Sequence, residues 1–337
     1  MIIVMKPGTP VKESNRLKKE LEKQGVSIDM SRGANYCILG VVGDTSGLDP
    51  DQIRVNEWVE KVVRVTEPYK CANKVLHSGP DVIEVSGVPV GGKKLTVIAG
   101  PCSVETAKQV NQVAAIVKQN GAQMLRGSAF KSRNFPYAFQ GLRDNALEML
   151  YEAAKKNHLP LVTEIISVEK IAEFVEHVDL IQVGARSMGN VELLKELGKT
   201  NVPILLKRGP SATVEEWLLA AEYIMSRGNE KVILCERGIR TFETYTRNTL
   251  DLSAILAVKK LSQLPVLVDP SRATGIWWMV ADMTKAAIMA GADGVMLDVH
   301  NDPENAWSDG VQSLNPQHFA QLMQELKGFA KLAGREI

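Results

Sequence analysis

Eight short apolar runs, each ending at a charged or reactive residue, constrain the fold of this chain more than any other feature. They lie at residues 95–100, 124–127, 161–164, 180–186, 204–208, 232–237, 266–269 and 294–298. Stretches with helical patterning, roughly ten to twenty residues long, separate them. These alternations of strand and helix predict an α/β fold, a (β/α)8 TIM barrel. In such barrels the active site lies at the carboxyl ends of the strands.

A barrel of about 250 residues leaves room for a second domain in a chain of 337 residues. Residues 1–70 predict a ferredoxin-like β-α-β-β-α-β domain, with strands at 2–5, 26–30, 36–42 and 62–65 and helices at 11–23 and 49–59. Residues 71–94 predict a linker with a β-hairpin at 82–90, placed to close the amino-terminal mouth of the barrel at 95–337. The small domain suits effector binding or assembly equally well.

Composition excludes several classes of protein. A net charge of +1 gives no support for a bulk nucleic-acid role. No apolar run approaches the roughly 20 residues of a membrane span, and the start, Met-Ile-Ile-Val-Met-Lys, has no signal-peptide pattern. The four scattered cysteines contain no CxxC and fit reduced thiols. We therefore expect a cytoplasmic protein without nucleic-acid or membrane partners.

Cationic residues gather at the predicted strand ends. They are Arg126, Lys131, Arg186, Lys207 and Arg237. Any one of these residues alone is as consistent with a solvated loop charge as with a binding site. Five cations at one mouth, however, repel each other unless an anion neutralises them. Arginine binds both phosphate and carboxylate in bidentate fashion, so a small phosphorylated acid is the expected ligand. Arg133 with Asn134 predicts a second phosphate site, and hence two phosphorylated substrates.

The motifs around these residues match a known family. They are IAGPCSVE at 98–105, LRG at 125–127, PYAFQG at 136–141, IQVGAR at 181–186, LLKRG at 205–209, ILCERGIRT at 233–241, NTLD at 248–251 and SDGVQSL at 308–314. Over its whole length the chain resembles the 3-deoxy-D-arabino-heptulosonate 7-phosphate (DAHP) synthases of the type I beta subgroup, which are close relatives of the 3-deoxy-D-manno-octulosonate 8-phosphate synthases.

The resemblance implies a transferase that forms a C–C bond. C3 of phosphoenolpyruvate attacks the aldehyde of a phosphorylated aldose, most simply erythrose 4-phosphate, water adds at C2, and inorganic phosphate leaves. The product, DAHP, belongs to the shikimate pathway of aromatic amino acid biosynthesis. The resemblance also implies a homotetramer and an aromatic amino acid as effector of the amino-terminal domain.

Residue roles follow by motif match. Phosphoenolpyruvate is expected to contact the five cations Arg126, Lys131, Arg186, Lys207 and Arg237. Glu164 is expected near C2, where it helps to position the water, and Lys131 is the expected proton donor to the acceptor oxygen. The expected acceptor-binding residues are Arg133, Asn134 and Asp269.

The chain departs from the family at the metal site. Members that use a divalent metal (Mn, Zn or Fe) coordinate it with Cys, His, Glu and Asp, and the matching positions here are Cys102, Arg272, Asp298 and Asp309. A guanidinium has no lone pair to offer a metal. Our hypothesis is that Arg272 takes the place of the metal, pairs with Asp298 and Asp309, and polarises the acceptor carbonyl as a catalytic residue. The alternative is that Arg272 points outward and Cys102, Asp298 and Asp309 retain a weak metal site.

The acceptor side has also changed. The loop at 131–136 is KSRNFP where the family usually has KPRTSP, and Trp277 and Trp278 stand where cations are frequent. Either the two indoles pack under the barrel or at a subunit interface, or the acceptor is a less anionic aldehyde. A catalytically weak, phosphoenolpyruvate-binding regulatory subunit is the competing class. His300 suits acid–base work or a structural role, and Cys235 is expected to be a buried apolar residue.

Overall fold

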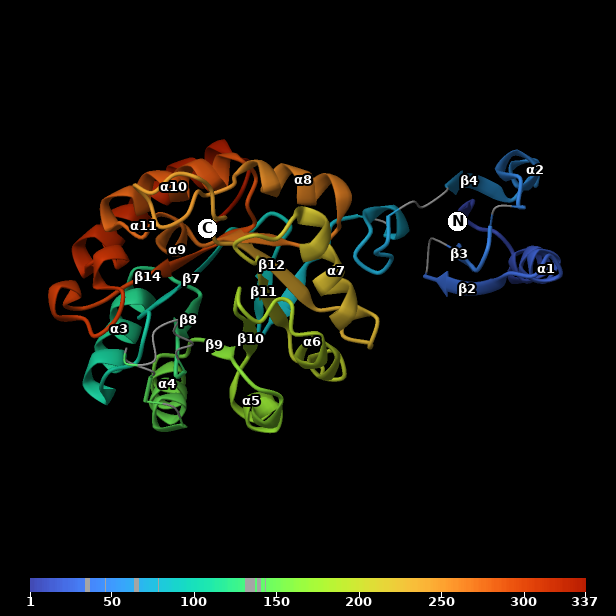
Figure 1. Ribbon diagram of the computed structural model, residues 1–337. Helices are drawn as coiled ribbons and strands as arrows, with labels where there is room; N and C mark the ends of the chain where they lie inside the picture. Colours follow the sequence, from blue (N-terminus) through green and yellow to red (C-terminus); the bar gives the residue numbers. More distant parts are fainter. Residues whose placement is uncertain are drawn as a thin grey trace. The chain divides into compact units, whose positions relative to one another are not determined.

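The computed structural model describes residues 1–33, 37–45, 47–63, 67–77, 79–130, 137, 141–142 and 144–337. The chain divides into two compact units, Met1–Ser78 and Gly79–Ile337 (Figure 1). No helix among the described residues is long and apolar enough to cross a membrane. The four cysteines, all within the described ranges, form no disulfide.

The amino-terminal unit has the predicted ferredoxin-like fold. Its elements are β1 (Ile2–Met5), α1 (Val11–Glu22), β2 (Ser27–Arg32), β3 (Cys37–Val42), α2 (Pro50–Arg54) and β4 (Val59–Val63). The sheet order is β2-β3-β1-β4, and its neighbouring strands are antiparallel. Helix α1 buries Ser14, Leu17 and Leu21, which lie on one face at helical spacing. The two leucines pack with Ile3 and Leu39 in the core of this unit.

Two predicted boundaries in this unit are wrong. The helix predicted at 49–59 covers only Pro50–Arg54, and the last strand begins at Val59 instead of residue 62. Asp49 caps the short helix by accepting a hydrogen bond from the Asp51 amide. Val59 and Val62 are both buried in the core, so tertiary burial overrides the helical pattern of this stretch. Residues 36, 64 and 65 of the predicted strands lie outside the described residues.

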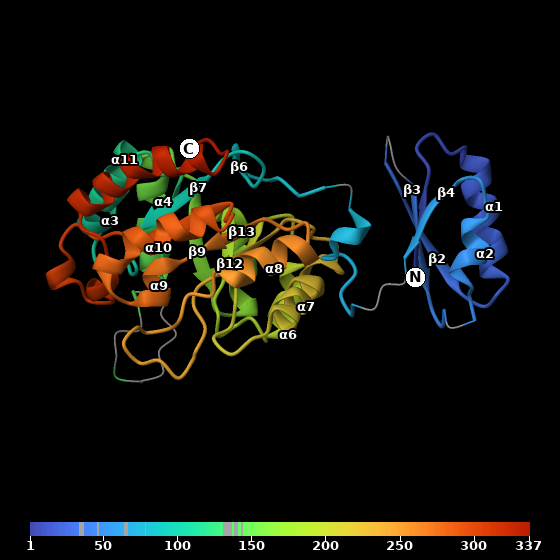
Figure 2. The same cartoon turned by 90° about the horizontal axis from the view of Figure 1, so that it is seen from above.

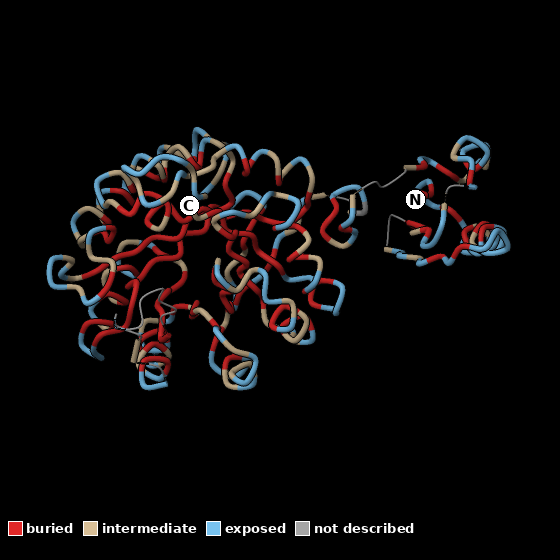
Figure 3. Tube along the Cα trace, viewed as in Figure 1, coloured by how far each residue is buried: buried red, intermediate tan, exposed pale blue. Residues whose placement is uncertain are grey.

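The second unit is a closed parallel barrel, as predicted. Its strands are β7 (Thr96–Gly100), β8 (Met124–Gly127), β9 (Leu161–Ile165), β10 (Leu180–Val183), β11 (Ile204–Lys207), β12 (Val232–Glu236), β13 (Val266–Val268) and β14 (Gly294–Asp298). They follow one another around the barrel, and β14 pairs with β7 to close it. The strands are almost wholly buried (Figure 3), as expected of parallel strands that are covered on both faces.

Helices surround this barrel (Figure 2). They are α3 (Ala107–Gln119), α4 (Asp144–Lys156), α5 (Ile171–His177), α6 (Val191–Leu197), α7 (Val214–Met225), α8 (Ser253–Leu261), α9 (Pro270–Thr274), α10 (Trp277–Met289) and α11 (Pro316–Leu332), with single 3-10 turns η2 (Val168–Lys170), η3 (Pro303–Asn305) and η4 (Gly310–Gln312). The 3-10 turn η1 (Lys74–Leu76) belongs to the amino-terminal unit. The run predicted to extend to residue 186 is a strand only as far as Val183, because a turn begins after Gly184.

The predicted hairpin is β5 (Ile83–Val85) and β6 (Val88–Val90), an antiparallel pair. Ser86 and Gly87 form its turn with positive φ angles of 44° and 85°. Ile83, Val85 and Val90 belong to the same core cluster as inward residues of the barrel strands. Ser86 also donates a hydrogen bond to Asp179, just before β10 begins. The hairpin therefore closes the amino-terminal end of the barrel and leaves the carboxyl ends of the strands as its open mouth.

Candidate active site

A cavity of about 380 Å³ lies at the carboxyl ends of the barrel strands. Its described lining contains seven cationic side chains, Arg126, Arg186, Lys207, Arg237, Arg240, Arg247 and Arg272. Two carboxylates, Glu164 and Asp309, also line it. Four of the five cations predicted at strand ends are thus brought together. The fifth, Lys131, lies outside the described residues, as do Arg133 and Asn134.

Two of the lining cations are buried in ion pairs. Arg126, inside β8, donates from Nη1 to Asp298 Oδ1 at 2.6 Å and to the Pro101 carbonyl at 2.9 Å. Lys207, the last residue of β11, pairs with Asp269. Both carboxylates have no exposed surface, so each buried positive charge is matched by a buried negative one. Arg126 and Lys207 therefore neutralise buried carboxylates as well as lining the cavity.

Arg237 lies directly after β12, in a cavity whose described lining has more cationic side chains than carboxylates. Burial lowers the pKa of its guanidinium, Asp269 opposes this effect, and Arg272, Arg247 and Arg186 lower the pKa further. Its charged form is therefore disfavoured by its own surroundings, and an anion placed among these groups relieves their mutual repulsion. The arrangement suits a ligand that carries a phosphate and a carboxylate.

Glu164 faces the cavity from β9. Its Oε2 accepts a hydrogen bond of 2.8 Å from Gln182 Nε2, and the two residues are paired in register on neighbouring strands. Gly184, which follows β10, makes room for this carboxylate, because a Cβ added there meets Glu164 Oε1 at 2.1 Å. The backbone and Gln182 thus fix a carboxylate among cations, where it can accept a hydrogen bond from a bound water.

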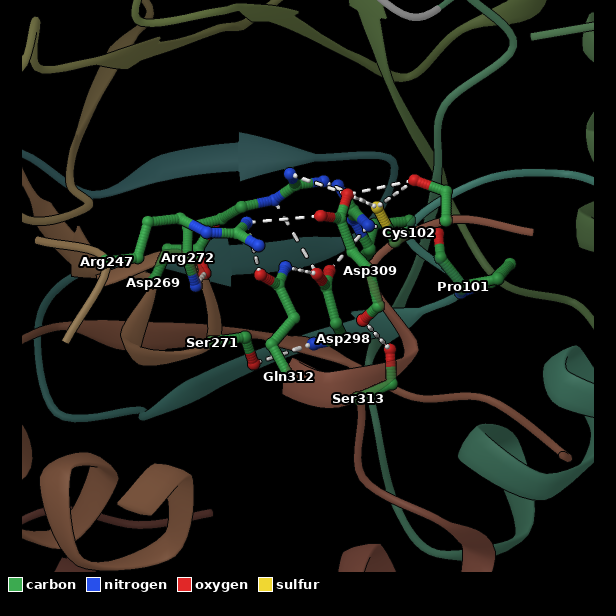
Figure 4. A network of polar contacts seen from close by, with 12 residues as sticks. Pro101, Cys102, Arg247, Asp269, Ser271, Arg272, Asp298, Asp309, Gln312 and Ser313 are labelled. Atoms are coloured by element: carbon green, nitrogen blue, oxygen red, sulfur yellow. Dashed lines mark hydrogen bonds and ion pairs between the residues drawn. The ribbon is translucent and has the colours of Figure 1, made fainter. Parts of the chain in front are cut away.

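Arg272 lies at the edge of the cavity with its guanidinium enclosed by anionic and thiol groups (Figure 4). Its Nη2 donates to Cys102 Sγ at 2.7 Å, and its Nη1 donates to Asp309 Oδ2 at 3.2 Å. Its Nε lies 3.6 Å from Asp298 Oδ2. Burial alone lowers the pKa of Arg272, but Cys102, Asp298, Asp309 and Asp269 together raise it well above its ordinary value. Arg272 therefore stays protonated.

Asp309 connects this cluster to a second arginine. Its Oδ1 accepts from Arg247 Nη1 at 3.1 Å, and the same Nη1 donates to Gln312 Oε1 at 2.6 Å. Its Oδ2 accepts from the Cys102 thiol and from the Ser308 hydroxyl, each at 2.9 Å. Gln312 in turn donates from Nε2 to Asp298. Every predicted metal-ligand atom of Asp309 and Cys102 is thus engaged by side chains of the chain itself.

The residues present do not fit a divalent metal. The predicted geometry in which Arg272 points outward is wrong, because its guanidinium lies between Cys102, Asp298 and Asp309. Among the described residues, no group of three or more His, Cys, Asp or Glu side chains is arranged to hold a metal ion. A dication about 4 Å from a guanidinium is repelled by about 8 kcal/mol at an effective dielectric constant of about 20.

Asp269 lies among buried groups outside the described cavity lining. Asp269 is fully buried, caps α9 by accepting from the Arg272 amide at 2.9 Å, and pairs with Lys207 through its other oxygen. It does not appear in the described cavity lining, so its contact with an acceptor stays a prediction. It holds Lys207 and the first turn of α9 in place, which positions two cations of the cavity.

The two indoles do not pack under the barrel, contrary to one prediction. Trp277 and Trp278 begin α10 with 41% and 52% exposure, and neither lines the described cavity. Trp277 stacks on His318 with ring centroids 4.4 Å apart. His300 is buried, accepts from the Asp302 amide at Nδ1, and places Nε2 3.3 Å from Glu105, away from the described cavity lining. These contacts favour its structural interpretation. Cys235 is fully buried in the barrel core, as predicted.

Sequence reasoning missed several residues of the cavity. Arg240, Arg247 and Asn248 line it, and Gln182 and Gln312 orient its carboxylates. All but Arg247 fall inside the family-like motifs at 181–186, 233–241, 248–251 and 308–314, and this match was the available signal. Their individual contributions depend on side-chain contacts that no strand-end pattern contains.

Known proteins resemble this chain over its whole length. The chain matches the DAHP synthetase I family over residues 81–332 and the DAHP synthase ferredoxin-like domain over residues 1–67. A phospho-2-dehydro-3-deoxyheptonate aldolase of Thermotoga maritima is 43% identical over 337 residues, covering 100% of both chains. A crystal structure of a Thermotoga maritima protein of that name, also called DAHP synthase, superposes with a TM-score of 0.79 at 43% identity and covers 99% of this chain and 98% of its own. A 2-dehydro-3-deoxyphosphooctonate aldolase of Syntrophobacter fumaroxidans is 29% identical over 72% of this chain and 90% of its own. The chain therefore belongs to the DAHP synthetase I family and carries that family's ferredoxin-like domain at its amino terminus.

Proposed function

We propose that this protein is a C–C bond-forming transferase that condenses phosphoenolpyruvate with erythrose 4-phosphate to give DAHP and inorganic phosphate. The observation that carries the proposal is the cavity with seven cationic side chains at the mouth of a barrel of this family. The relative at 43% identity is named for a seven-carbon acid. Subtracting the three carbons of phosphoenolpyruvate leaves a four-carbon aldehyde as acceptor.

Phosphoenolpyruvate is assigned to Arg126, Arg186, Lys207 and Arg237, with Lys131 as a further predicted contact. The supporting argument is electrostatic, since the excess positive charge around Arg237 is relieved by an anion. Fixed cations bring C3 of the donor and the acceptor aldehyde together and stabilise charge that develops in the transition state. The held carboxylate of Glu164 accepts a hydrogen bond from the water that adds at C2.

The acceptor is assigned to the same cavity. Arg240, Arg247 and Asn248 also line it and can contact a second phosphate. Arg133, Asn134 and Asp269 stay predicted acceptor contacts, and Lys131 stays the predicted proton donor. The half-exposed position of Trp277 and Trp278, outside the described lining, gives no support for a more apolar acceptor.

The wider setting follows from the family. We assign the reaction to the shikimate pathway of aromatic amino acid biosynthesis, in the cytoplasm, and the assembly to a homotetramer. An aromatic amino acid is the proposed effector of the ferredoxin-like domain. The competing candidate, a regulatory subunit that binds phosphoenolpyruvate without turnover, is favoured only by the altered metal position at Arg272.

The test measures phosphate release from phosphoenolpyruvate with two aldehydes, the four-carbon erythrose 4-phosphate and the five-carbon arabinose 5-phosphate, and identifies the product by mass spectrometry. We expect turnover with the four-carbon aldehyde and a seven-carbon product. Preference for the five-carbon aldehyde would contradict the acceptor assignment. Binding of phosphoenolpyruvate without turnover, with or without added metal, would support the regulatory subunit instead.

A further inference from the structure

Hydrogen bonds hold both the backbone and the side chain of Arg272. The backbone amide of Arg272 donates to Asp269 Oδ1 at 2.9 Å, and its backbone carbonyl accepts from Asn248 Nδ2 at 3.3 Å. Its side chain contacts Cys102 and Asp309 and retains 17% exposure, on a surface that lines the cavity. It is therefore a preorganised positive charge that a bound substrate can reach.

Members of this family typically depend on a divalent metal. We propose that in this protein the guanidinium of Arg272 replaces that metal, binds and polarises the aldehyde oxygen of the acceptor, and makes the reaction independent of metal. The proposal rests on the condensing activity proposed above. It extends that activity to the group that stabilises the developing negative charge on the acceptor.

The hydrogen-bonding inventory of Arg272 supports this role. A guanidinium has five N–H donors, with two on each terminal nitrogen. The contacts to Asp309 and Cys102 use one donor of Nη1 and one of Nη2. Cys102 Sγ and Asp309 Oδ2 lie 2.9 Å apart and share the outer end of the guanidinium, so the second donor on each nitrogen points to a different side. A carbonyl oxygen can therefore take one of these donors, from Nη1 or from Nη2.

The step balances without a metal. C3 of phosphoenolpyruvate bonds to the aldehyde carbon with the electron pair of its C2=C3 double bond, which leaves C2 electron-poor. The carbonyl π bond breaks, and its electron pair moves to the oxygen that Arg272 holds. A guanidinium stays protonated in proteins, so Arg272 stabilises this oxygen without giving up a proton. The oxygen takes its proton from another acid, for which Lys131 is the predicted group. Water then adds at C2, and the C–O bond to the phosphate breaks.

The neighbouring charges show that this cluster needs no added cation. Asp298 pairs with Arg126, and Asp309 pairs with Arg247 as well as with Arg272. The acidic groups are therefore neutralised by arginines without any added cation. The shorter Asp298 side chain, at the family's Glu position, leaves Arg272 Nε 3.6 Å from Asp298 Oδ2.

Cobalt titration of the chelator-treated full chain tests the proposal, because Co²⁺ bound by a thiolate gives a near-ultraviolet charge-transfer band. We expect no such band in the wild type, and one equivalent of bound Co²⁺ in R272H/D298E, which rebuilds the family's ligand set. The same variant with C102S added is the control and should lose the band. If R272H/D298E does not fold by circular dichroism, the single variant R272H takes its place.

Activity gives an independent readout. Wild-type turnover should stay within twofold after chelation, whereas Arg272→Met should lower kcat by about 10²- to 10³-fold with phosphoenolpyruvate affinity nearly unchanged. A thiolate–Co²⁺ band in the wild type, or activity lost on chelation and restored by metal, would overturn the proposal. A wild type that shows no band and no turnover with any aldehyde would instead overturn the condensing activity on which the proposal rests.

Discussion

Replacing Arg126 with Met tests the buried ion pair that joins the two sides of the barrel closure. Arg126 lies in β8 and Asp298 in β14, with β7 between them, and their side chains are 2% and 0% exposed. Removing the guanidinium takes an ion-pair partner from the buried Asp298 carboxylate, which keeps its contacts with Gln312 and Arg272. Breaking a buried ion pair lowers the free energy of unfolding by about 3–5 kcal/mol. Because the Asp298 carboxylate keeps other partners, we expect a loss at the lower end, about 3 kcal/mol.

Thermal unfolding measures this loss. For a domain of 150–250 residues, 1 kcal/mol shifts Tm by about 2–4 °C, so we expect Tm to fall by about 6–12 °C. The matched control is Lys195→Met, which removes the surface pair of Lys195 with Glu192, whose side chain is 74% exposed. That variant should lose less than about 1 kcal/mol. Adding Asp298→Asn to Arg126→Met should restore part of the loss, because no uncompensated charge remains. Equal Tm values for the Arg126 and Lys195 variants would refute this reasoning.

Three further predictions follow from individual contacts. Gly184→Ala should lower kcat by about 10²-fold, because the added Cβ displaces Glu164. The control Gly189→Ala should leave kcat unchanged, because a Cβ added there meets no atom within 4 Å. Equal phosphate-release rates for the two variants would contradict this. Trp278→Ala should keep kcat/KM within about twofold, since the indole is 52% exposed and lies outside the described lining; a tenfold loss would revive a role in acceptor binding. Burial raises the pKa of the Cys235 thiol to about 12, so native-state alkylation at pH 8, read by peptide mass spectrometry, should be far slower at Cys235 than at the partly exposed Cys71.

The strand order and the position of the site were predictable because parallel barrels obey strong topological rules. Eight apolar runs predict the strands, and the carboxyl ends of those strands meet at one mouth whatever the helices contain. The gathering of Arg186, Lys207 and Arg237 follows from that rule alone. The sequence also predicted that Arg272 cannot be a metal ligand, since a guanidinium has no lone pair.

The pairing of charges was not predictable from the strand pattern. Arg126 and Asp298 are 172 residues apart and meet only because the barrel closes between β14 and β7. The sequence identifies Arg126 as a cation at a strand end. Only the structure shows that its side chain pairs with the buried Asp298 and also lines the cavity. Likewise, Arg247 comes from a long loop, and only the folded chain shows that it shares Asp309 with Arg272.

At the short helix Pro50–Arg54 the sequence pattern predicted a longer helix than the structure contains. Its residues continue a helical pattern to Val59, yet Val59 is needed in the core of the sheet, so tertiary burial ends the helix early.

A crystal of the full chain, grown with phosphoenolpyruvate and soaked in Zn²⁺, tests the central claim most directly through anomalous scattering at the zinc edge. We predict phosphoenolpyruvate among Arg186, Lys207 and Arg237, the Arg272 guanidinium in contact with Cys102 and Asp309, and no anomalous peak there. A peak about 2.3 Å from Cys102 Sγ, the usual zinc–sulfur distance, with Arg272 turned away, would contradict the account.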